Sequence, residues 1–171
     1  MRIASATLDV TTLGLLGENH FEAMAVPGIL AQLTALGEAA VGDAWKVFRY
    51  HDEPSVLIRY MPPYQGFSSS PFAMTSAMEE ILRIAAAEEC TRLAITLGDA
   101  QSMGVPTHIF YQGIVRGLVD GIPRYHAMRH VALVTLNMTD KKALDTVLSE
   151  FEPASTLIVS HDQATGVAAI P

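Results

Sequence analysis

The chain alternates between short apolar runs, which are typical of β-strands, and longer stretches in which apolar residues recur at helical spacing. The strand-like runs comprise residues 3–10, 21–26, 45–50, 55–60, 92–97, 131–136 and 156–159, with a short edge strand at 166–170. The third and fourth runs are separated by His-Asp-Glu-Pro, a segment that favours a turn. These two runs are therefore predicted to form a β-hairpin.

Amphipathic stretches between these runs predict helices. The clearest one follows Pro71, where an apolar stripe lies opposite Thr, Ser, Glu and Arg. The stripe consists of Met74, Ala77, Met78, Ile81, Leu82 and Ala85. Ser70 before Pro71 suits a helix start, because proline at the first helical position loses no helical hydrogen bond. The other helical stripes cover residues 29–40, 107–122 and 144–151, the last of them capped by Thr139 or Asp140.

Strands and helices in alternation predict a three-layer α/β/α fold, with a mostly parallel mixed sheet between helices on both faces. Residues 131–136 are apolar without interruption, as a parallel strand buried on both faces requires. The 171 residues contain no repeat, no low-complexity tract and no long linker. We therefore expect a single α/β domain over residues 1–171.

Composition and charge narrow the functions that such a domain could have. Half of the residues are hydrophobic, which describes a packed core, and 11 Lys and Arg against 18 Asp and Glu give a net charge of −7. Without a basic cluster, no nucleic-acid partner is expected. No stretch approaches the roughly 20 apolar residues of a membrane-spanning helix, and residues 1–9 lack the apolar core of a signal peptide. A cytoplasmic location is expected, and Cys90, the only cysteine, allows no internal disulfide.

A ligand site in an open α/β sheet lies beyond the carboxyl ends of the strands, where loops lead into helices. Four loops fit this description, and they are rich in Gly, Ser, Pro, Asn and Asp where the neighbouring runs are apolar. They are residues 27–28, 62–70, 98–106 and 137–140. We therefore expect any ligand to bind among these loops.

The loop over residues 62–70 offers Gly66, Ser68 and Ser69 just before a predicted helix. Backbone N–H groups and hydroxyls at a helix start can bind a phosphate or carboxylate, although the same residues would also form an ordinary capped helix start. The sequence Gly-Phe-Ser-Ser-Ser approaches the nucleophile elbow G-x-S-x-G, but Ser70 occupies the place of the second glycine. A serine hydrolase is therefore not favoured.

Two later loops carry polar residues directly after strands. Asp99 could act as a general base or bind a ribose hydroxyl, and it is also an ordinary turn residue. Gly104 precedes the next helix, and Asn137 follows the run 131–136. His126 and His130 are four residues apart, but no acidic residue lies between them as the zinc motif H-E-x-x-H requires. No metal site is predicted.

The order of these elements resembles that of a macro domain and, equally, of the macro-like N-terminal domain of leucine aminopeptidases. The resemblance covers most of the chain and rests on element order and loop placement. It begins with the strand containing Leu8-Asp9-Val10-Thr11 and continues through residues 21–27, a Ser-rich helix start and the strand before Gly98. ADP-ribose-binding macro domains carry an Asn-rich segment after the second strand, whereas this chain has Val-Pro-Gly-Ile-Leu at residues 26–30. These 171 residues are not expected to include the catalytic metal-binding domain of the aminopeptidases. A proteasome-assembly-chaperone-like domain is a weaker alternative.

The resemblance implies a macro-like module, non-catalytic or weakly catalytic, that binds a small anionic or nucleotide-like ligand. The candidate binding residues are Gly66, Ser68, Ser69, Gly104 and Asn137. One alternative is a small hydrolase or transferase in which Asp99 acts as the base. Another is an assembly or regulatory protein that acts through homo-oligomer contacts. The sequence identifies no cofactor. Because the net charge is −7, backbone donors and hydroxyls would have to hold an anion.

Overall fold

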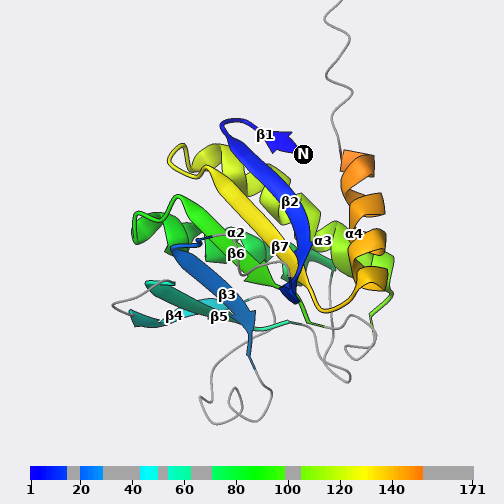
Figure 1. The fold of residues 1–171 in the computed structure, drawn as a ribbon, viewed down its shortest axis with the longest axis horizontal. Helices are drawn as coiled ribbons and strands as arrows, with labels where there is room; N and C mark the ends of the chain where they lie inside the picture. Colours follow the sequence, from blue (N-terminus) through cyan, green and yellow to red (C-terminus); the bar gives the residue numbers. More distant parts are fainter. Residues whose placement is uncertain (15–19, 29–42, 50–53, 63–70, 99–104, 152–171) are drawn as a thin grey trace, which may run out of the picture.

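The computed structural model describes residues 1–14, 20–28, 43–49, 54–62, 71–98 and 105–151. These residues form a seven-stranded sheet packed against helices (Figure 1). The strands are β1 (Arg2–Ile3), β2 (Ala6–Thr12), β3 (Ala23–Pro27), β4 (Ala44–Arg49), β5 (Val56–Tyr60), β6 (Arg92–Thr96) and β7 (His130–Thr135). The helices are α2 (Pro71–Ala87), α3 (Thr107–Gly121), the 3-10 turn η2 (Ile122–Arg124) and α4 (Met138–Phe151).

The strand order is β1-β2-β7-β6-β3-β5-β4. The five strands from β2 to β5 run parallel, and β1 and β4 pair antiparallel at the two edges. The predicted hairpin is confirmed, because β4 and β5 are consecutive antiparallel neighbours. The fold is thus α/β with a mostly parallel mixed sheet, and the five parallel strands place their carboxyl ends along one edge.

The main hydrophobic core lies between one face of the sheet and α2, α3 and α4. It joins inward-facing residues of the parallel strands to the apolar stripes of all three helices. Its members include Leu8, Ala25, Ile58, Leu93, Ile95, Val131 and Leu133 from strands, and Met78, Ile81, Leu82, Ile114, Leu118, Leu144 and Val147 from helices. On the opposite face Ala94, Ala132 and Val134 are buried with Phe21. Strands β6 and β7 are thus buried on both faces, as the central strands of a three-layer fold are.

Helices α2 and α3 approach closely because glycine lies at their contact. A Cβ at Gly117 would stand 2.7 Å from the Thr75 carbonyl oxygen and 2.8 Å from the Met78 Cβ. The Thr75 hydroxyl also donates a hydrogen bond across this contact to the Gly113 carbonyl, at 3.1 Å. The contact fixes α3, whose first residue follows the loop that leaves β6.

One predicted helix boundary is wrong. Helix α4 begins at Met138, and its N-cap is Asn137 and not Thr139 or Asp140. The Asn137 side-chain oxygen accepts the Asp140 N–H at 2.8 Å, because asparagine directly before the helix can reach the unpaired donors of the first turn. The predicted helix over residues 29–40 and the strands at 156–159 and 166–170 lie outside the described residues. None of the described helices is long and apolar enough to cross a membrane.

Candidate functional site at the carboxyl edge of the sheet

The carboxyl ends of the parallel strands contain a topological switch point. After β3 the chain continues to β4 and β5 on one side of β3, whereas after β6 it continues through α3 to β7 on the other side. Because β3 and β6 are neighbours, the loops that follow them leave in opposite directions. Ligands of open α/β sheets bind in the crevice that forms at such a point. The junction of β3 and β6 is therefore the candidate site.

The ladder between the two strands ends at this junction. Pairing between β3 and β6 extends only from Ala23 opposite Leu93 to Ala25 opposite Ile95. In contrast, β3 stays paired with β5 as far as Pro27, and β6 stays paired with β7 as far as Thr96. Beyond Ala25 and Ile95 each strand is therefore paired only with its outer neighbour.

Tyr60, the last residue of β5, contacts both strand ends. Its side chain is completely buried, and its hydroxyl donates a hydrogen bond to the Thr96 carbonyl at 2.8 Å. Its own carbonyl accepts a hydrogen bond from the N–H of Gly28, also at 2.8 Å. A single residue thus connects the exit of β3 with the exit of β6.

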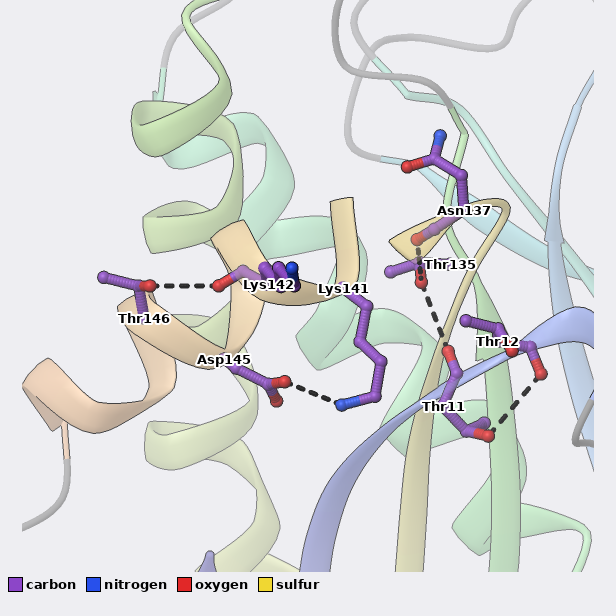
Figure 2. Close-up of polar contacts among 8 residues, drawn as sticks. All are labelled: Thr11, Thr12, Thr135, Asn137, Lys141, Lys142, Asp145 and Thr146. Carbon is purple, nitrogen blue, oxygen red and sulfur yellow. Dashed lines mark hydrogen bonds and ion pairs between the residues drawn. The ribbon is translucent and has the colours of Figure 1, made fainter. Parts of the chain in front are cut away.

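A second polar cluster lies where β2 and β7 end (Figure 2). The hydroxyl of Thr135, which is buried, lies within donating distance of the carbonyl oxygens of Thr11, at 3.3 Å, and Asn137, at 3.2 Å. On α4, Lys141 forms an ion pair with Asp145 at 2.7 Å. Thr135 thus fixes the turn from β7 into α4 against the end of β2.

Asn137 is the predicted site residue that the structure describes. Its amide donates to the Asp140 carboxylate at 2.8 Å, while its oxygen accepts the Asp140 N–H, so the two residues form a reciprocal cap. The backbone carbonyl of Asn137 accepts the Lys141 N–H at 3.1 Å. The side chain is exposed at the predicted edge, but its two described hydrogen bonds serve the helix.

Exposed apolar side chains adjoin this cluster. Leu13, Leu136 and Met138 are 53%, 53% and 55% exposed. Leu13 and Leu136 directly follow the cross-strand partners Thr12 and Thr135, so both lie at the carboxyl ends of the neighbouring strands β2 and β7. We call these three residues the apolar corner. A group of large exposed apolar side chains is uncommon on a protein surface and often marks a binding site.

The remaining predicted site residues lie outside the described part of the chain. These are Gly66, Ser68, Ser69, Asp99 and Gly104. Sequence reasoning missed Tyr60, Thr135 and the apolar corner. The alternating burial of β5 could have placed Tyr60 on the inner face, but its bond to Thr96 depends on the strand order, which the sequence did not reveal.

The histidines do not form a metal site in the part of the chain that the structure describes. His130 lies at the amino end of β7, opposite to the candidate site, where its Nε2 is 3.0 Å from the Asp9 carboxylate. Its ring also packs against Phe21, with centroids 5.2 Å apart. The described residues contain no group of three or more His, Cys, Asp and Glu that could hold a metal ion.

Comparison with known proteins identifies the fold. No known family profile matches the sequence, and no curated protein matches it. The Oceanobacillus iheyensis macrodomain with ADP superposes with a TM-score of 0.70 at 10% identity, covering 88% of this chain and 94% of that chain. The Trypanosoma brucei macrodomain in complex with ADP-ribose gives a TM-score of 0.63 at 10% identity, covering 84% and 69%. The chain therefore has a macro domain-like fold.

Proposed function

We propose that this protein is a macro-like module that binds a small nucleotide-like ligand, ADP or ADP-ribose, at the carboxyl edge of its sheet. The observation that carries the proposal is the end of the β3–β6 ladder at the switch point of a macro domain-like sheet. Solved structures with this fold hold ADP or ADP-ribose. A nucleoside diphosphate is thus the ligand class that the fold supports.

The apolar corner supports a role in binding the base. A purine has two apolar faces and a polar rim, so the exposed side chains of Leu13, Leu136 and Met138 suit one of its faces. The corner lies at the β2–β7 junction, two strand spacings, or about 10 Å, from the β3–β6 junction. We propose that the base lies at the corner and the diphosphate extends toward the switch point.

Backbone donors and hydroxyls would hold the diphosphate. On α4, Lys141 is already paired with Asp145, and the chain carries a net charge of −7. Groups of backbone N–H donors can bind an anion without a side-chain cation. Gly66, Ser68, Ser69 and Gly104 remain the proposed donors, and Asp99 remains the proposed partner of a ribose hydroxyl or, if the module turns over its ligand, the base.

Isothermal titration calorimetry with ADP and ADP-ribose tests this proposal. The wild-type protein should bind at least one of them with a Kd in the micromolar range, and Leu136→Gln should weaken binding about 5- to 20-fold, because it replaces apolar contact with an amide of similar size. Ala87→Gln, which adds the same group at the exposed end of α2, serves as the matched control and should bind like the wild type.

Two results would contradict the proposal. Absence of heat with both ligands at millimolar concentration would exclude nucleotide binding of useful affinity. Equal affinities for Leu136→Gln and Ala87→Gln would show that the apolar corner takes no part in binding. Incubating any ligand that binds with the protein, followed by chromatography, would reveal turnover and add a catalytic role.

A further inference from the structure

Two hydrogen bonds to β5 show toward which neighbouring strand the N–H and C=O groups of each β3 residue point. The Glu22 carbonyl accepts the Val56 N–H at 3.1 Å, and the Gly28 N–H donates to the Tyr60 carbonyl at 2.8 Å. In a parallel strand, the N–H and C=O of alternate residues point to alternate neighbours. The even-numbered residues of β3 therefore face β5, and its odd-numbered residues, including Pro27, face β6.

The directions of the backbone groups of β6 follow from its hydrogen bond to β7. The Leu97 N–H donates to the Val134 carbonyl of β7 at 2.8 Å, so odd-numbered residues of β6 face β7 and Thr96 faces β3. With Ala25 opposite Ile95, a continued ladder would require the N–H of residue 27 to donate to the Thr96 carbonyl. Residue 27 is proline, which has no N–H. The ladder between β3 and β6 therefore ends at this position.

The Tyr60 hydroxyl takes the place of the missing donor. It lies 2.8 Å from the same Thr96 carbonyl, on a side chain that is completely buried. A phenol reaching from β5 past β3 thus replaces a main-chain bond that would have drawn β3 and β6 together. Because the Tyr60 carbonyl also holds Gly28, the spacing of both strand ends depends on this residue.

We propose that Pro27 and Tyr60 form a positioning pair that holds the carboxyl ends of β3 and β6 apart for the ligand. Pro27 prevents the ladder from closing the crevice, and the Tyr60 hydroxyl satisfies the carbonyl that is left over. Both are positioning residues, and their role in binding rests on the proposed nucleotide site. The substitution of either residue should therefore alter ligand affinity through the spacing of the strand ends.

Three variants test the pair: Tyr60→Phe, Pro27→Ala and the double variant. Tyr60→Phe leaves the Thr96 carbonyl without its donor, so its Tm should fall by about 3–8 °C and its Kd for ADP-ribose should rise about 5- to 10-fold. Pro27→Ala alone should lower the Tm slightly, because it frees the unfolded chain. In the Tyr60→Phe background the same change should raise the Tm, because the new N–H can donate to Thr96.

Binding separates positioning from mere stability. The double variant should regain most of the Tm lost in Tyr60→Phe, whereas its affinity for ADP-ribose should stay reduced, because the completed ladder narrows the crevice. The new backbone amide at position 27 should be protected from hydrogen exchange. Tyr125→Phe, a matched change near the opposite edge, should leave the affinity unchanged.

The outcomes distinguish this inference from the proposed function. If the Tm changes of the two single variants simply add up in the double variant, the Tyr60 hydroxyl does not replace a ladder hydrogen bond at the Thr96 carbonyl. This holds whether or not a ligand binds. Wild-type affinity in Tyr60→Phe would overturn the positioning role. If the wild-type protein binds neither ADP nor ADP-ribose, the proposed function and the positioning role both fail. Non-additive Tm changes would still support the replacement of the residue 27 N–H by the Tyr60 hydroxyl as the donor to the Thr96 carbonyl.

Discussion

Asn137 combines a helix cap with a place at the candidate edge. Its side-chain oxygen accepts the N–H of Asp140, and its amide contacts the Asp140 carboxylate. A residue with both hydrogen-bonding groups engaged can still offer exposed surface to a ligand, but its first effect on substitution is on α4. Its structural role and its proposed ligand role therefore need separate measurements.

Asn137→Ala should lower the free energy of unfolding by about 1 kcal/mol, because it leaves a first-turn donor of α4 without its cap. Asn137→Ser should keep most of the stability, since a serine oxygen can replace the acceptor. Urea unfolding followed by circular dichroism measures both values. Equal stability of the alanine variant and the wild type would contradict the assignment of the cap. Weaker ADP-ribose binding by the serine variant would support a direct ligand role for Asn137.

Among the elements, the close contact of α2 and α3 depends on small residues. Gly117→Ala places a methyl group 2.7 Å from the Thr75 carbonyl oxygen. Because this oxygen belongs to the backbone of α2, the clash can be relieved only by moving one helix away from the other. We expect a loss of about 1–3 kcal/mol, even though alanine is the better helix former. A Cβ at Gly121 would stand 2.7 Å from Leu82 Cδ1, the end of a flexible side chain, so Gly121→Ala should cost less. Thermal unfolding of the two variants checks this order, and an equal or reversed order would contradict the described contact.

The sequence pattern predicts most of the elements that the structure describes, although the single run predicted over residues 3–10 forms two strands, β1 and β2. The uninterrupted apolar run of β7 indicated burial on both faces, and the turn before β5 indicated the hairpin. The pattern could not predict which strands are neighbours, because alternation reports the buried face of a strand and not its partner. The position of β7 between β2 and β6, and with it the switch point, comes from the structure.

The site could be predicted only as a region. The loop compositions predict the carboxyl edge as the place of the site. Pro27 is predicted only as a turn residue, because its missing N–H ends a ladder only if β6 lies beside β3, which the structure shows. The sequence pattern predicts Tyr60 only as a strand residue, because its contact with Thr96 depends on the strand order. Asp99 and the glycines and serines of the predicted loops remain predictions, because they lie outside the described residues.

For the molecule as a whole, the net charge of −7 bears on how an anionic ligand binds. If backbone donors and hydroxyls hold the diphosphate, added salt screens the repulsion between the acidic protein and its ligand without breaking essential ion pairs. The affinity for ADP-ribose should therefore stay constant or rise between about 50 and 300 mM NaCl. Calorimetry at several salt concentrations measures this, and a steep loss of affinity would show that side-chain cations carry the binding.

We propose that a nucleotide-like ligand binds where the β3–β6 ladder ends and extends to the apolar corner. A ¹H–¹⁵N NMR titration with ADP-ribose tests both the binding and its place. We expect saturable shifts of the Gly28, Gly98 and Leu136 amides at the carboxyl edge, while those of Thr91 and Arg129 at the amino edge stay unchanged. Unchanged carboxyl-edge amides at millimolar ADP-ribose, or shifts confined to the amino edge, would contradict binding at this place.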